Sequence, residues 1–400
     1  MYLFPLSVLL FFPLPYATAH ATGVESSQAW ETRNAHMTSF DLLPTSFEIH
    51  WLSIVNSFVL VILLTAFLAI ILMRVLKNDF SRYMDTDDEE DPSEEESGWK
   101  LIHGDVFRMP KHAMLFSAFL GSGAQLFVTT FALFTMIILG IFNPIKRGNT
   151  AQVLSLLYIL TSGIGGYISA RHYKKMGGEN WVWNIVLCAT VYSGPFIVLF
   201  IVLNSVAFGF ASTAALPFGT IMVYTSLYFL LALPLTIIGG IVGRNTAGDF
   251  DAPCRTTKVA RQIPDMPWFR RGAAQMFVAG FLPFSAIYIE LHYIFASLWG
   301  HKSYSLFGIL FLAFMMLVIV TSFINVALTY FQLAIEDHRW WWRSMFSGGA
   351  TGFFMFGYCF FYFFERSEMN GVMQTMFFFG YMGAVSYGFF LMLGFVGFVR

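Results

Sequence analysis

The sequence has 400 residues, of which 57% are hydrophobic, 18% are aromatic and only 12% are charged. Soluble globular chains carry about 25% charged residues, so the composition excludes an ordinary soluble protein and indicates several membrane spans. The formal net charge of -1 provides no field for nucleic acid, and three cysteines are too few for a disulfide framework. We therefore expect no nucleic-acid partner.

The chain starts with an apolar run, residues 1–20, which contains three prolines and ends near Ala17-Thr18-Ala19. This resembles a signal peptide with its cleavage site, although its beginning carries no Lys or Arg. The alternative is an unrelated apolar start. Residues 21–50 would then form a short lumenal segment.

Nine further apolar runs reach the length of about 20 residues that a spanning helix needs. The predicted spans are 51–73, 115–141, 150–170, 181–206, 217–242, 273–299, 305–331, 341–364 and 372–398. The fold class predicted is an all-α polytopic membrane protein, a nine-helix transmembrane bundle. Residues 74–114 would be an acidic cytoplasmic loop between the first span and an eight-helix core at 115–400.

The basic residues indicate the orientation of this bundle. With the segment before the first span placed outside, 18 of the 23 Lys and Arg residues fall on the inner side. Cytoplasmic loops carry the excess of Lys and Arg. We therefore predict a lumenal N-terminus and a cytoplasmic C-terminus.

The first cytoplasmic loop contains nine acidic residues in the twelve positions Asp85–Glu96. Such a run repels itself and buries little apolar area, which is typical of a solvated linker. The alternative is a tail that faces an adaptor or is phosphorylated at Ser93.

Glu290 is a carboxylate placed well inside a predicted span. An ionisable group at that depth costs at least about 2.5 kcal/mol and is a functional hypothesis by default. Glu290 and His292 are two positions apart and do not share a helix face. The candidate intramembrane polar site comprises Glu290, His292 and Asn325, which serves either as a proton or cation site, as a recognition site for polar groups of another helix, or for packing alone.

Small residues recur at helical spacing in the spans, and two stretches are true GxxxG patterns: Gly239 with Gly243, and Gly348 with Gly352. Small faces let helix backbones approach closely. We expect them to pack within the bundle or to form a face for other helices. Prolines 195, 234 and 283 are predicted to break their spans near mid-depth.

The stretch "QLAIEDHRWWWRS", Gln332–Ser344, lies between the seventh and eighth spans. Tryptophan rings prefer the headgroup zone, and basic residues beside them meet anionic lipid. The candidate interfacial motif comprises Glu336, Asp337, Arg339, Trp340, Trp341, Trp342 and Arg343.

Several long stretches, in order, resemble the nonaspanin family, also called the nine-transmembrane superfamily. They are "EIHWLSIVNSFVLVILLTAFLAIILMRVLKNDFSRY", "HGDVFRMP", "ASTAALPFGTI", "FDAPCRTTKVARQIPDMPWFRR", "LPF" with "IEL" at 282–291, "QLAIEDHRWWWRS" and "MQTMFFFGYMGAVSYGFFLMLG". The similarity covers about residues 38–398.

This resemblance implies a membrane-trafficking factor of Golgi and endosomal membranes. Such a protein would bind transmembrane segments of client proteins through small-residue faces and polar groups, and aid their sorting. Coat or adaptor proteins and membrane lipids would be its cytoplasmic partners. The family carries a large lumenal domain and a lysine-containing tail; about fifty residues precede the first span here, so we expect an incomplete member.

Motifs of enzymes are absent from the sequence: it has no His-Glu-x-x-His zinc motif, P-loop or dinucleotide fingerprint. We expect no catalytic residues, cofactor or metal site. The alternative function is a proton- or cation-coupled secondary transporter or channel that uses Glu290.

Overall fold

The structure, a computed structural model, describes residues 51–86, 104–141, 149–210, 212, 215–248, 267–268, 271–299, 307–335, 337–366 and 371–399. Within these ranges the chain is almost entirely helical and has no strand, which confirms the all-α prediction. The signal-peptide-like segment, the acidic run beyond Thr86 and Glu336 lie outside the described residues.

The predicted spans correspond one by one to helices. The elements are α2 (Trp51–Thr86), η2 (Gly104–Phe107), α3 (Ala113–Ile138), α4 (Asn149–Lys175), α5 (Trp181–Gly209), α6 (Phe218–Leu227), η3 (Tyr228–Ala232), α7 (Leu233–Thr246), α8 (Gly272–Trp299), α9 (Phe307–Ala334), α10 (Trp340–Arg366) and α11 (Val372–Val399). The span predicted at 217–242 is the continuous unit α6–η3–α7. Helices form because each satisfies its own backbone hydrogen bonds where no water is present.

Eight of the described helices are long and apolar enough to cross a membrane. The ninth long helix, α10, falls outside that set because its glycines, serines and tyrosines lower its mean hydropathy. It still lies inside the bundle and packs mainly on α11 and α8. Its place within the bundle is therefore shown by its neighbours rather than by its composition.

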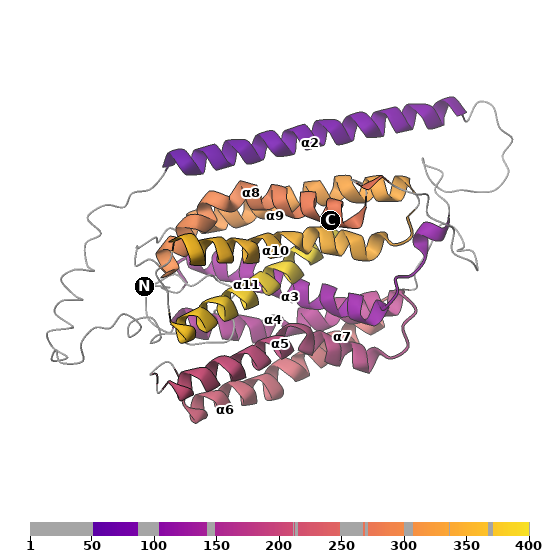
Figure 1. The fold of residues 1–400 in the computed structure, drawn as a ribbon. Coiled ribbons are helices and arrows are strands. Elements are labelled where there is room, and N and C mark those ends of the chain that lie inside the picture. Colours follow the sequence, from indigo (N-terminus) through magenta and orange to yellow (C-terminus); the bar gives the residue numbers. More distant parts are fainter. Residues whose placement is uncertain are drawn as a thin grey trace.

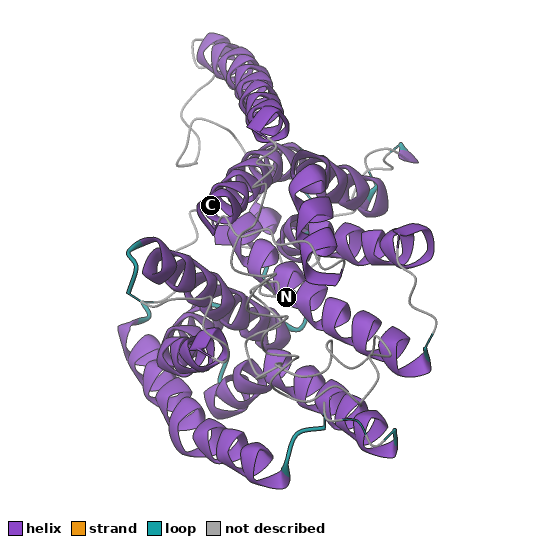
Figure 2. Ribbon diagram, turned by 90° about the vertical axis from the view of Figure 1, so that its left-hand side faces the viewer, coloured by secondary structure: helices purple, strands orange, loops and turns teal. Residues whose placement is uncertain are grey.

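Helix α2 differs from the prediction in length. It continues to Thr86, past the end of the predicted span at residue 73, because its polar last turns are compatible with a helix. Figure 1 shows α2 along the outside of the bundle, next to α8 and α9. Figure 2, turned by 90°, also places it at the edge.

The centre of the bundle is formed by α3, which packs on α4, α5 and α11. On one side α4 packs on α7, and on the other α11 packs on α10. The largest apolar cluster joins α3, α4, α5, α9, α10 and α11, and includes Phe116, Tyr192, Trp341 and Leu393. Glycines with positive φ follow α3 and α4, at Gly140 and Gly177, where the chain turns away.

The proline prediction is corrected by the structure. Helices α5 and α8 run unbroken through Pro195 and Pro283. Pro195 lacks the N–H that would bond the carbonyl of Val191, and the Tyr387 hydroxyl of α11 donates to that carbonyl instead, at 2.9 Å. Only Pro234 follows an irregular turn, the π-helical segment η3.

Candidate functional site

The three tryptophans at the start of α10 hold the segment that precedes α3. The indole N–H groups of Trp340, Trp341 and Trp342 donate to the backbone carbonyls of Val106, Arg108 and Lys111 at 3.0, 3.0 and 2.8 Å. The interfacial interpretation is therefore incomplete, since these polar groups are used inside the protein. Two of the stretches that suggested the family, "HGDVFRMP" and "EDHRWWWRS", are in direct contact.

The tryptophan rings also pack on α3 and α11. Trp340 and Trp341 stack with a centroid separation of 4.4 Å, and both rings lie against Phe398 at the end of α11. Trp342 makes an edge contact with Phe116 of α3. The starts of α3 and α10 and the end of α11 are thereby joined at one end of the bundle, the predicted cytoplasmic end.

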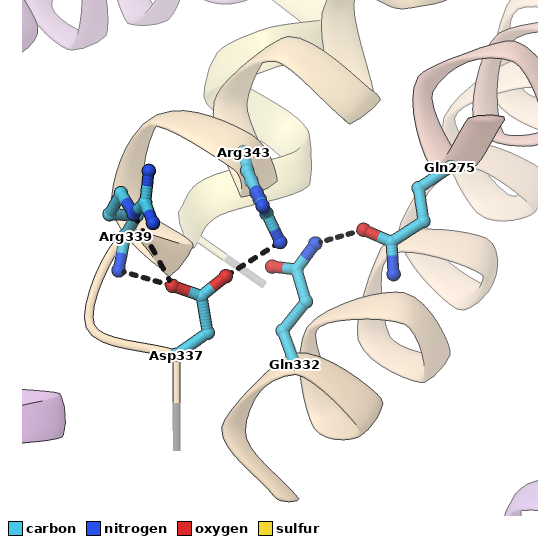
Figure 3. Close-up of polar contacts among 5 residues, drawn as sticks. All are labelled: Gln275, Gln332, Asp337, Arg339 and Arg343. Carbon is cyan, nitrogen blue, oxygen red and sulfur yellow. Dashed lines mark hydrogen bonds and ion pairs between the residues drawn. The ribbon is translucent and has the colours of Figure 1, made fainter. Parts of the chain in front are cut away.

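Asp337 is the centre of a charged cluster at the same end. Its side chain is only 1% exposed and forms an ion pair with Arg343 at 2.6 Å. It also accepts the backbone N–H of Arg339 at 3.0 Å, just before α10 begins. Figure 3 shows Asp337 between the two arginines. A buried carboxylate needs such partners, because an unpaired charge at low dielectric is costly.

A pair of glutamines lies beside this cluster. Gln332 of α9 donates to the side-chain oxygen of Gln275 of α8 at 2.7 Å, and both are buried (Figure 3). Arg343 also lies against Gly272, at the start of α8. The cluster therefore ties α8, α9 and α10 together.

Glu290 lies in α8, one of the helices that are long and apolar enough to span a membrane, and lines a partly open cavity of about 90 Å³. It is 4% exposed, and neither carboxyl oxygen has a well-oriented hydrogen-bond partner among the described residues. The buried Ser57 hydroxyl of α2 lies near the same carboxyl. The cavity is lined by side chains of α3, α8, α9, α10 and α11, and Thr130 is the other polar side chain among the described lining residues.

His292 and Asn325 do not join Glu290. A ring nitrogen of His292 bonds the Tyr358 hydroxyl of α10 at 2.9 Å. Asn325 donates to the carbonyl of Thr321 and lies against Gly397 of α11. It does not line the cavity. The three residues of the candidate site thus lie apart: His292 is on another face of α8 than Glu290, as their spacing of two predicts, and Asn325 lies against α11 instead of lining the cavity.

The four glycines of the GxxxG patterns pack against helices of the same chain. A side-chain carbon at Gly239 or Gly243 would overlap the backbone of α4, and one at Gly348 or Gly352 would overlap the backbone of α11. Both small-residue faces are therefore occupied, as the packing interpretation predicted. In this structure they offer no groove to another helix.

A different surface is hollowed at mid-helix, on the outer side of α8 and α10. An open groove of about 610 Å³ is lined by Phe277, Phe284, Tyr288, Phe353, Phe354, Gly357, Tyr358 and Phe361. A side-chain carbon at Gly357 would meet nothing within 4 Å. The rings lie along one strip of each helix. The sequence shows this strip as aromatic residues at helical spacing, but other helix faces are equally aromatic, so the spacing does not single out the groove.

Comparison with known proteins now identifies the family. Residues 22–372 match the family described as Endomembrane protein 70. The chain belongs to this family. The nonaspanin resemblance is confirmed by relatives that carry the name of the same superfamily.

"Transmembrane 9 superfamily member 4" of Arabidopsis thaliana is 54% identical over 374 residues, which are 94% of this chain and 63% of that protein. "Transmembrane 9 superfamily member 1" of Pongo abelii is 48% identical over 389 residues, 95% of this chain and 64% of that protein. The chain thus spans under two thirds of the length of these Endomembrane protein 70 relatives. No solved structure matches it.

Proposed function

We propose that this chain is a membrane-trafficking factor of Golgi and endosomal membranes that binds transmembrane segments of client proteins and aids their sorting, without catalysis. Membership of a family described as Endomembrane protein 70 supports the location. Both GxxxG faces are packed against helices of the same chain, so a client helix must dock on a different surface.

The aromatic groove between α8 and α10 is the observation that carries the proposal. Its rings lie near the middle of two helices, at a depth where a partner must itself be apolar. Phe277 and Phe353 are both 59% exposed, so the groove has broad apolar walls. Gly357 leaves room at its centre, and close approach over small residues is how helices associate in lipid.

The test fills the groove. Client proteins are first captured by a photo-crosslinking residue placed at Phe353 and are identified by mass spectrometry. Cells that lack the endogenous protein then receive wild type or Gly357→Trp, and the surface amount of each captured client is measured. We expect wild type to restore it and Gly357→Trp to fail.

The matched control is Gly219→Trp, which adds the same ring at another exposed helical glycine with nothing within 4 Å. Equal restoration of the captured clients by Gly357→Trp and by the control would show that the groove does not receive them. A second control places the photo-crosslinking residue at Phe229 of η3, which is also 59% exposed. Capture of the same proteins there would show that clients contact the exposed surface without preference for the groove.

A second candidate function, a proton- or cation-coupled transporter, is favoured by one observation, the cavity that holds the Glu290 carboxyl. It predicts that Glu290→Gln abolishes a flux in proteoliposomes. The sorting function instead predicts that the wild-type protein carries no flux and that loss of function mislocalises its clients.

A further inference from the structure

The interior of the bundle contains a polar seam that leads toward the Glu290 cavity. Its members are buried hydroxyl and amide side chains of α9, α10 and α11. We define the polar seam as Thr321, Asn325, Thr329 and Gln332 of α9, Ser344, Ser347 and Thr351 of α10, and Ser386 of α11. The α9 members recur every three or four residues, so they form one stripe along that helix.

At the predicted cytoplasmic end the seam is hydrogen-bonded. The Thr329 hydroxyl donates to Ser344 at 3.3 Å, and Ser344 donates to the carbonyl of Gly397 at 3.1 Å. Gln332 reaches Gln275, and the ion pair of Asp337 lies beside them (Figure 3).

Nearer the cavity the polar atoms of the seam have no partner within the described residues. They are the hydroxyls of Thr321, Ser347, Thr351 and Ser386 and the side-chain oxygen of Asn325. Buried polar groups are normally hydrogen-bonded, so five such atoms on three neighbouring helices call for mobile hydrogen-bonding partners such as water.

The seam ends one helical turn from the cavity on two helices. Leu317, four residues before Thr321 on α9, lines the cavity, and so does Met355, four residues after Thr351 on α10. Four residues span about 6 Å along a helix, roughly the reach of one or two waters. The seam and the cavity are thus about one helical turn apart on α9 and on α10.

The lining of the cavity selects the ligand. Hard metal cations take six or more oxygen ligands, whereas the described side chains here offer the Glu290 carboxyl, the Thr130 hydroxyl and the nearby Ser57 hydroxyl among methyl and aromatic groups. A proton needs only one carboxylate oxygen. A charged carboxylate in an apolar interior is costly, and the addition of a proton removes the charge.

We propose that Glu290 is a proton-binding site and that its proton arrives from the Asp337 end of the bundle along the polar seam. The exchange is a relay: one O–H bond forms at the Glu290 carboxylate, each water or hydroxyl along the seam gives up one proton and receives another, and the net proton is taken from the solvent at the Asp337 end. This inference is independent of client binding at the groove and holds with either candidate function.

The other described groups around Glu290 do not compete for this proton. Helix α2 presents Ser57, α3 presents Thr130, and the cavity-lining residues of α9, α10 and α11 are apolar. His292, on α8 itself, does not line the cavity and bonds Tyr358 of α10 instead. Titration within the described lining therefore belongs to Glu290.

The site is tested by infrared difference spectroscopy of the purified protein in lipid nanodiscs, between neutral and acidic buffer. We expect a carbonyl band of a protonated carboxylic acid that grows in acid and is lost in Glu290→Gln, which keeps the side-chain size. A band unchanged by Glu290→Gln, a Glu290 band that does not change with pH, or one that responds to Na⁺ or K⁺ at constant pH would overturn the proposal.

The route is tested by the rate at which the same band shifts after transfer to heavy water. The double variant Thr321→Val, Thr351→Val removes two hydroxyls and keeps their shape. We expect the exchange to slow about tenfold, the factor for loss of about 1.4 kcal/mol of barrier stabilisation. The control is Thr190→Val, whose exposed hydroxyl bonds only its own helix. Unchanged exchange in the double variant, with the Glu290 band intact, would overturn the route.

Discussion

Helices α2 and α11 show opposite relations between apolarity and burial. The spanning part of α2 has a mean hydropathy of 2.9 but is only 6% buried, whereas that of α11 has a mean hydropathy of 1.8 and is 61% buried. Helix α11 contains five glycines, and α2 contains none. Lipid tails are as apolar as leucine, so the side chains of α2 gain little by leaving them. Between these two helices, the difference in burial follows close backbone approach rather than hydropathy.

The largest effect should come from closing the approach between α10 and α11. Gly348→Leu would place a side chain against the backbone of α11, which has no flexible atoms to give way. We expect a loss of stability of more than about 3 kcal/mol and little folded protein, measured as the monodisperse fraction in detergent. Gly357→Leu, on the open face of the same helix, is the control and should fold normally.

Asp337→Ala should have the next largest effect, because it leaves the charge of Arg343 half-buried and unpaired. Loss of one partner of a buried pair costs about 3–5 kcal/mol, and we expect a marked fall in the apparent Tm. Asp337→Leu combined with Arg343→Met should recover much of it. Arg339→Ala, which removes a mostly exposed guanidinium, should change little; an equal fall there would contradict the central role of Arg343.

A smaller effect is expected where the segment before α3 is held. Trp341→Phe keeps a ring but removes the donor to the Arg108 carbonyl, at a cost of about 1–3 kcal/mol. The segment should detach more often, and trypsin should cut after Arg108 and Lys111 faster. Trp183→Phe, at an exposed ring of α5, is the control. Equal trypsin rates for the two variants would mean that the indole bond does not retain the segment.

The smallest effects should be found on α2. Tyr330→Phe removes the hydroxyl of α9 that donates to Asp79, a polar contact between α2 and the core, and should weaken α2 attachment by about 1 kcal/mol. Cysteine crosslinking between α2 and α9 would measure the attached fraction. Leu63→Ala, at a side chain that is 65% exposed, should leave it unchanged. A larger loss for Leu63→Ala would show that the outer face of α2 is covered by protein.

Much of the fold could be predicted from the sequence, because a span is a local property. The predicted segments 181–206 and 372–398 became α5 and α11 with shifts of at most a few residues. The extension of α2 and the irregular turn η3 before Pro234 were missed, because polar helix ends and π turns leave no hydropathy signal.

The candidate site was predicted less completely. Glu290 was found because a carboxylate in a span is unusual, but its cavity depends on side chains from five helices. Thr321, Asn325 and Thr329 follow a spacing of four that could have shown a polar stripe. The partners of Trp340–Trp342 are more than 230 positions away along the chain and could not have been inferred from the motif alone.

The sequence by itself determined the fold class, the spans, the family and the place of Glu290 within a long apolar helix. The reason is that each helix satisfies its backbone within itself and must match the bilayer on its own. Only the tertiary structure decided that the small-residue faces are internal, that the tryptophans bind a preceding segment, and that a polar seam leads toward Glu290. Within a bilayer, hydropathy does not distinguish a helix face that contacts protein from one that contacts lipid. Shape and hydrogen bonding between helices therefore decide which faces pack together.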